Sequence, residues 1–87
     1  MSDQPAKRIL IVEDNAIMAD VLRRALEHGG FQAHITNNGV QALEACKAQA
    51  FDAAVTDYQM PEMDGLEFVL RLRNGNQNRN IPLIFVS

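Results

Sequence analysis

The chain has 87 residues, of which 47% are hydrophobic and 22% are charged. This composition is that of one small globular domain, and it excludes a disordered tail, a coiled coil and a collagen-like repeat. Eight Lys and Arg against eleven Asp and Glu give a net charge of −3, which argues against direct nucleic-acid binding. The single cysteine, Cys46, excludes an internal disulfide and a cysteine-based zinc site. Because no apolar run approaches the length of a membrane span, we expect a soluble cytoplasmic domain without a membrane partner.

The first elements predicted along the chain are a strand and a helix. Residues 7–12 carry a short aliphatic run, which predicts a strand buried on both faces, as in parallel sheets. Asp14 or Asn15 then caps a helix over residues 16–28, and a pair of glycines ends it. The predicted apolar face of this helix consists of Ile17, Val21, Leu22, Ala25 and Leu26.

The middle of the chain predicts two strands that flank a helix. Residues 31–36 form a less apolar strand, which we expect at an edge of the sheet. After a turn comes a helix over 40–49, followed by a strand over 51–56 that ends at Asp57. The inward side chains of the helix are expected to be Val40, Leu43 and Cys46.

The last part of the chain predicts a loop over 58–64, a third helix, a polar loop over 74–80 and a strand over 81–86. Pro82 is expected at the start of this strand, where a missing N–H is tolerated. The apolar positions that mark the third helix are Leu66, Val69 and Leu72, with Phe68 beside them on the same face.

Strands and helices therefore alternate from one end of the chain to the other. This order predicts an α/β fold with a parallel sheet and right-handed crossovers. We expect residues 7–87 to form one domain, preceded by a short tail over residues 1–6.

Acidic residues follow two of the predicted strands. Glu13 and Asp14 come directly after the first strand, and Asp57 ends the third. In an open α/β sheet, ligands bind at the carboxyl ends of the strands, so neighbouring first and third strands would bring these acids together. Like charges at about 4 Å repel by roughly 4 kcal/mol at an effective dielectric of 20, and a hard divalent cation relieves that repulsion. The pattern predicts a Mg²⁺ site.

Plainer roles compete with this interpretation at single positions. Asp14 taken alone is more often a turn former or helix cap than a metal ligand. Asp64, just before the third helix, is interpreted as a cap. His28 and His34 have no partner at metal-ligand spacing and are interpreted as surface residues, and Cys46 as a buried core residue.

Three segments carry a family resemblance: residues 9–15, 55–65 and 81–87. Together they resemble the receiver domain of two-component response regulators, and the likeness extends from Arg8 onward. It implies a flavodoxin-like (CheY-like) α/β fold, with a parallel sheet and helices on both faces. The most specific matching positions are Asp57, Met60, Pro61, Met63, Asp64 and Gly65.

The resemblance also implies a role for each matching site residue. Asp57 would be the phosphoacceptor, and Glu13 and Asp14 would hold Mg²⁺ together with it. The backbone carbonyl of Gln59 would complete the metal site, and Ser87 would be the switch hydroxyl that binds the phosphoryl group. Such a domain is regulatory: it catalyses its own phosphorylation and dephosphorylation, and its partner is a sensor histidine kinase or a phosphotransfer protein.

The sequence departs from the family pattern at its end. Family receivers have five strand–helix units, and we find no counterpart of the fourth helix, the fifth strand, the fifth helix or the lysine that follows the fifth strand. The strand over 81–86 would then be an exposed apolar edge, so we expect a homodimer or a swapped assembly through it.

Three other functions are weighed against a phosphoacceptor. An aspartate-nucleophile phosphatase of the haloacid-dehalogenase type requires a second Asp two residues after the nucleophile, where this chain has Gln59. An interaction module that is no longer phosphorylated remains open for so short a chain. Nucleotide binding is disfavoured because no glycine-rich phosphate loop follows the first strand.

Overall fold

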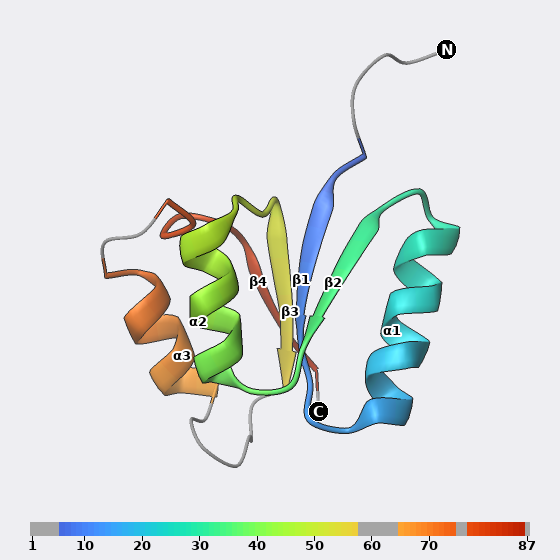
Figure 1. The fold of residues 1–87 in the computed structure, drawn as a ribbon, viewed down its shortest axis with the longest axis horizontal. Helices are drawn as coiled ribbons and strands as arrows, with labels where there is room; N and C mark the ends of the chain where they lie inside the picture. The colour runs from blue at the N-terminus through green and yellow to red at the C-terminus, as the bar shows by residue number, and fades with distance from the viewer. Residues whose placement is uncertain (1–5, 58–64, 75–76, 87) are drawn as a thin grey trace.

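The structure, a computed structural model, describes residues 6–57, 65–74 and 77–86. Within these residues the chain forms four strands and three helices in alternation (Figure 1), as predicted. The elements are β1 (Arg8–Val12), α1 (Ala16–His28), β2 (Gln32–Thr36), α2 (Gly39–Ala48), β3 (Ala53–Asp57), α3 (Gly65–Leu72) and β4 (Leu83–Val86).

The strands form one parallel sheet in the order β2-β1-β3-β4. In register, Ile11 pairs with Val55, and Val55 pairs with Ile84. Figure 1 shows α1 on one side of the sheet and α2 and α3 on the other. The predicted α/β class with helices on both faces is confirmed, and so is the edge position of β2. Most importantly, β1 and β3 are direct neighbours.

The largest hydrophobic cluster of the described residues lies between the sheet and the pair α2 and α3. Alternate residues of a strand point to the same side, so Leu10 of β1 and Ala54 of β3 both face this cluster. Phe68 and Leu72 of α3 are fully buried in it, and each contributes about 2–3 kcal/mol of stabilisation. Cys46 is also fully buried, and burial raises the pKa of its thiol to about 11. The core role predicted for this cysteine is confirmed.

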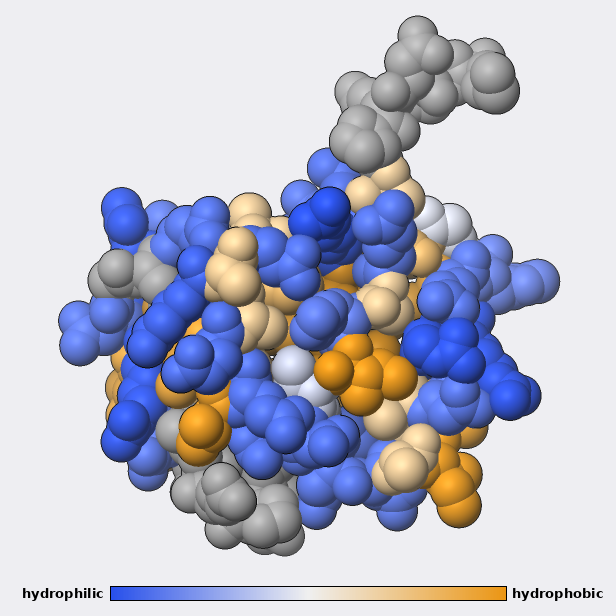
Figure 2. All heavy atoms as spheres, viewed as in Figure 1, coloured by the Kyte–Doolittle hydropathy of each residue, from blue (hydrophilic) through white to orange (hydrophobic). Residues whose placement is uncertain are grey.

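The predicted apolar face of α1 is only partly correct. Ile17 is 78% exposed and Val21 is 54% exposed, whereas Ala19 is buried. Orange surface over the lower part of α1 is visible in Figure 2. The physical reason is that α1 makes its extensive contacts with only two strands, β1 and β2. Its apolar stripe is therefore wider than the surface that covers it.

Two further burial predictions are corrected. Val40, at the start of α2, is 44% exposed, while Ala42, two residues later and on the opposite side of the helix, is fully buried. In α3, Leu66 is 52% exposed, and the buried positions are Phe68 and Leu72. Residues four apart share a stripe of a helix, so this short helix buries the pair 68 and 72 and turns Leu66 outward.

The turns follow the predicted chemistry. Gly30 has φ of 91°, a left-handed conformation that favours glycine, directly after α1. Pro82 precedes β4, and its carbonyl accepts a hydrogen bond from the Ala54 N–H at 3.0 Å. β4 is the outermost strand beside β3, and its Ile84 and Phe85 are 53% and 45% exposed. The predicted exposure of this apolar strand is confirmed.

Candidate metal centre

The N-cap of α1 shows whether the carboxylate of Asp14 is used as a helix cap. The N-cap is Asn15, whose side-chain oxygen accepts a hydrogen bond from the Met18 N–H at 2.9 Å. The helix therefore begins after residue 15, and Asp14 stays in the loop that leaves β1. Of the two caps that the sequence allowed, the structure has Asn15, so the carboxylate of Asp14 is left for another role.

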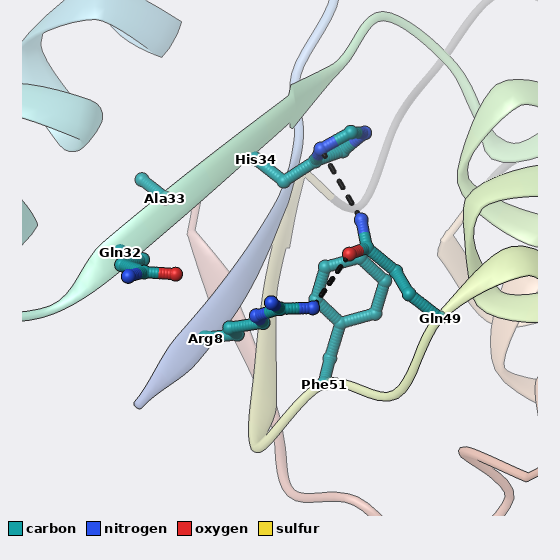
Figure 3. A pocket seen from close by; sticks show the side chains of 6 residues that line it. All are labelled: Arg8, Gln32, Ala33, His34, Gln49 and Phe51. Carbon is teal, nitrogen blue, oxygen red and sulfur yellow. Dashed lines mark hydrogen bonds between the residues drawn. The ribbon is translucent and has the colours of Figure 1, made fainter. Parts of the chain in front are cut away.

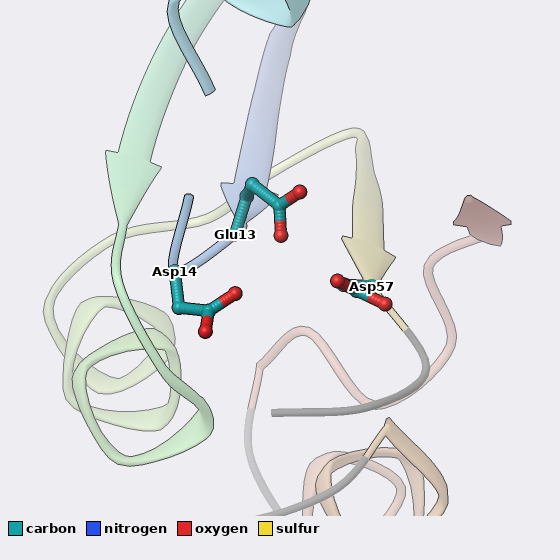
Figure 4. A group of neighbouring side chains, drawn as sticks. All are labelled: Glu13, Asp14 and Asp57. Carbon is teal, nitrogen blue, oxygen red and sulfur yellow. The ribbon is translucent and has the colours of Figure 1, made fainter. Parts of the chain in front are cut away.

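The predicted acidic residues meet at the carboxyl end of β1 and β3. Each of Glu13, Asp14 and Asp57 offers one carboxylate oxygen, and these oxygens all lie within 4.8 Å of one another. Figure 4 shows the three side chains directed toward a common space between the ends of the two strands. Glu13 is buried, Asp57 is half-buried and Asp14 is exposed. The group therefore reaches from the protein interior to solvent.

Glu13 is the electrostatically unusual member of this group. It is 5% exposed, and its Oε2 is the one buried side-chain oxygen or nitrogen among the described residues that has no hydrogen-bond partner. Its pKa is raised to about 6, chiefly because burial disfavours the charged form. A hydrogen bond with Asp57 and the negative charges of Asp57 and Asp14 raise it further, against a smaller lowering by the backbone of Asp14.

Thr36, at the end of β2, is a supporting residue that the sequence analysis missed. Its backbone carbonyl accepts a hydrogen bond from the Glu13 N–H at 3.0 Å. Its buried hydroxyl donates to the Ile11 carbonyl at 2.8 Å. The first bond ties the backbone of Glu13 to the end of β2, and the second ties Ile11 of β1 to the same residue. A lone threonine at a strand end carries no sequence signal of this role.

The residues present fit a magnesium ion. Mg²⁺ takes oxygen ligands at about 2.1 Å, so two ligands on opposite sides of the ion lie about 4.2 Å apart. The spread of 4.8 Å among the carboxylate oxygens is close to that value. The buried Glu13 Oε2 has no hydrogen-bond partner, so it is free to act as a ligand to a cation. The metal would neutralise the clustered charge and polarise phosphoryl oxygens.

Several predicted site residues fall outside the described part of the chain. These are Gln59, Ser87 and the interpreted cap Asp64. His28 and His34 are exposed, as the sequence analysis expected. Among the described residues, no helix is long and apolar enough to cross a membrane.

Comparisons with known proteins place the chain among proteins that share this fold. Residues 9–87 match the family model of the response regulator receiver domain. The chain is 35% identical over 81 residues to the polar-differentiation response regulator DivK of Brucella anthropi, which covers 93% of this chain and 66% of the relative. The chain thus spans just under two thirds of that relative. It is 42% identical over 80 residues to the response regulator MprA of Mycobacterium leprae, covering 92% of this chain and 34% of that protein.

The solved structures include one with a metal. The receiver domain of the sensor histidine kinase PA1611 from Pseudomonas aeruginosa, with magnesium coordinated in its active-site cleft, superposes with a TM-score of 0.88 at 28% identity. That match covers 94% of this chain and 67% of the other. Receiver domains are regulatory, bind Mg²⁺ at an acidic pocket and interact with histidine kinases or phosphotransfer proteins. On its fold, its acidic centre and these similarities, the chain belongs to the family of response regulator receiver domains.

Proposed function

We propose that this domain accepts a phosphoryl group on Asp57 in a Mg²⁺-dependent reaction and thereby regulates an output. The observation that carries the proposal is the convergence of Asp57 with Glu13 and Asp14 at the carboxyl end of two adjacent strands. Asp57 is half-buried, so its carboxylate is within reach of a donor at the surface. Glu13 and Asp14 are the residues that would hold the ion beside it.

The proposed reaction is nucleophilic substitution at phosphorus. A carboxylate oxygen of Asp57 attacks the phosphorus atom, and a new O–P bond forms. With a phosphohistidine donor on a kinase or phosphotransfer protein, the P–N bond breaks and the imidazole nitrogen takes up a proton. With a small acyl phosphate, the P–O bond breaks and a carboxylate leaves. The bound cation supplies charge neutralisation at the transferring group.

Two residues outside the described part complete the proposal. The backbone carbonyl of Gln59 would be a further metal ligand, and the hydroxyl of Ser87 would donate a hydrogen bond to the phosphoryl group. The expected result for Ser87→Ala is an unchanged site of modification with a weakened conformational response, measured by comparing amide spectra before and after phosphorylation.

The test is the intact mass of the chain after incubation with Mg²⁺ and acetyl phosphate. The wild type is expected to gain one phosphoryl group, and Asp57→Asn to gain none. Asp52→Asn is the matched control, because Asp52 is an exposed carboxylate at the other end of β3. An adduct in the control and none in Asp57→Asn assigns the acceptor. A folded wild type without an adduct, beside a reacting full-length DivK, would contradict the proposal and favour the interaction module.

We further propose that β4 pairs with a second copy of the chain. Its outermost position and the exposure of Ile84 and Phe85 support this, since an apolar edge strand is a template for pairing. Sedimentation velocity is expected to show a dimer that Ile84→Lys dissociates. Ile17→Lys, which adds the same charge at a more exposed apolar position on α1, is expected to leave the dimer intact. A monomeric wild type at all concentrations would overturn this proposal.

A further inference from the structure

A second group of polar side chains surrounds a small pocket at the amino end of the sheet, opposite the acidic centre. The pocket has a volume of about 200 Å³, and it is lined by Arg8, Gln32, Ala33, His34, Gln49 and Phe51 (Figure 3). Arg8 begins β1 and Gln32 begins β2, and the two are partners in register. His34 is the register partner of Leu10, so it lies on the face of the sheet that carries α2.

Gln49 organises the polar side chains of this pocket. Its side-chain oxygen accepts a hydrogen bond from Arg8 Nη1 at 2.8 Å. Its amide nitrogen lies 3.5 Å from His34 Nδ1, at the long end of hydrogen-bonding range. As Gln49 follows directly on α2, its position is set by the helix C-terminus. The Arg8 and His34 side chains are therefore held on either side of one amide.

The positive charge in the pocket forms no ion pair with a carboxylate of the described residues. Within residues 6–57, 65–74 and 77–86, the guanidinium of Arg8 makes no salt bridge. Asp52 lies next to Arg8, but its carboxylate accepts a hydrogen bond from the backbone N–H of Arg8 at 2.8 Å. A guanidinium has five N–H donors, and the bond to Gln49 uses one of them. Donors thus remain for a ligand.

The lining residues and the volume of the pocket limit the size and the chemistry of a ligand. The buried ring of Phe51 lies behind His34, with ring centroids 5.8 Å apart and an angle of 56° between the planes. Ligand pockets for drug-sized molecules and cofactors measure about 300–1,000 Å³, which is more than this pocket offers. An arginine fork, an imidazole and two amides are donors that match oxyanion geometry.

We propose that this pocket binds a small oxyanion, a carboxylate or a phosphate, through Arg8 with His34 and Gln49 beside it. The site is separate from the phosphoacceptor centre, since it lies at the opposite end of the parallel strands. The proposal does not depend on phosphorylation of Asp57.

The test is a titration of the full chain with phosphate and with acetate at constant ionic strength, followed by amide and side-chain NMR shifts. Saturable shifts are expected at Arg8, Gln32, His34 and Gln49, with a dissociation constant of about 1–10 mM. Arg8→Gln is expected to weaken binding about tenfold or more. Arg79→Gln, which removes one positive charge at another exposed position, is expected to have no effect.

A second variant keeps the proposal testable if Arg8→Gln fails to fold. Gln49→Glu preserves the shape of the side chain and places a carboxylate beside the guanidinium, so added acetate and phosphate should no longer bind. Saturable binding of either anion that is lost in this variant supports the site. The proposal is overturned by unsaturated shifts up to about 50 mM, by equal losses in Arg8→Gln and Arg79→Gln, or by shifts confined to the acidic centre.

Discussion

The two ends of the sheet differ in how completely their buried polar side chains are hydrogen-bonded. Near the amino end, Asn78 is fully buried and its hydrogen bonds are satisfied. Its side-chain oxygen accepts from the Phe51 N–H at 2.7 Å, and its amide nitrogen donates to the carbonyls of Cys46 and Gln49, each at 2.9 Å. At the carboxyl end, Glu13 is almost as buried, yet its Oε2 has no partner and its pKa is raised to about 6.

This difference separates a structural polar group from a functional one. A buried polar group that is fully hydrogen-bonded stabilises the fold, and here Asn78 joins α2 to the start of β3 and to the segment before β4. A buried carboxylate with one oxygen that has no hydrogen-bond partner destabilises the fold and retains its capacity to bind a cation. The carboxyl end is thus less stable than it would be with neutral side chains, as functional sites commonly are.

The largest effect is expected when the satisfied group is removed. Asn78→Ala leaves the buried Phe51 N–H without its acceptor and removes a donor from each of the Cys46 and Gln49 carbonyls, and we expect a loss of about 3 kcal/mol in the free energy of unfolding. Urea denaturation measures this loss. Asn80→Ala, at an exposed position in the same segment, is the control and should change stability little. Equal losses of stability in the two variants would contradict a structural role for the hydrogen bonds of Asn78.

A change of opposite sign, a gain in stability, is expected when the buried carboxylate of Glu13 is neutralised. Glu13 binds its proton more tightly in the folded state, with a pKa of about 6 against 4.5 as the reference. Its cost to stability is therefore absent below pH 4.5 and grows through pH 4.5–6. Above that range Glu13→Gln should be more stable than the wild type by about 2 kcal/mol in metal-free buffer.

Urea denaturation in EDTA at pH 4.5 and pH 7.5 checks this expectation. The gain should appear at pH 7.5 and vanish at pH 4.5. Glu44→Gln is the matched control, since Glu44 is an exposed glutamate on α2. A pH-independent gain, or the same gain in the control, would contradict the electrostatic explanation.

A smaller effect is expected from adding the cation that the centre fits. Ligand binding to the folded state alone stabilises by RT ln(1 + [L]/Kd), or about 1.4 kcal/mol when Mg²⁺ is present at ten times Kd. Asp14→Asn and Asp57→Asn should lose most of this gain, whereas Asp52→Asn should retain it. Thermal denaturation with and without Mg²⁺ provides the measurement, and a gain that survives in Asp14→Asn and Asp57→Asn would place the ion elsewhere.

The smallest effect concerns the residue that supports Glu13 from β2. Thr36→Val keeps the side-chain shape but removes the hydroxyl that donates to the Ile11 carbonyl, so stability should fall by about 1 kcal/mol. The Thr36 carbonyl still accepts the Glu13 N–H, so stabilisation by Mg²⁺ should persist. If Thr36→Val abolished the stabilisation by Mg²⁺, the hydroxyl itself would be needed to position the acidic residues.

Some of this molecule follows from short-range patterns in the sequence. The aliphatic run at residues 9–12, the asparagine before α1 and the glycines after it predict elements that the structure confirms within one or two residues. The three acids lie at the ends of β1 and β3, and parallel strands end at the same edge of a sheet. Their convergence could therefore be predicted once β1 and β3 were assumed to be neighbours, as they are.

The order of the elements and the types of side chain at the carboxyl end could be predicted from the sequence, because strand, cap and turn preferences act over a few neighbouring residues. The tertiary structure decided which apolar residues are buried, since Ile17 and Leu66 depend on elements far away in the sequence for cover. The hydrogen bonding of Asn78 and the lack of a partner for Glu13 Oε2 are likewise set by tertiary structure, because hydrogen-bond partners and burial come from segments distant along the chain.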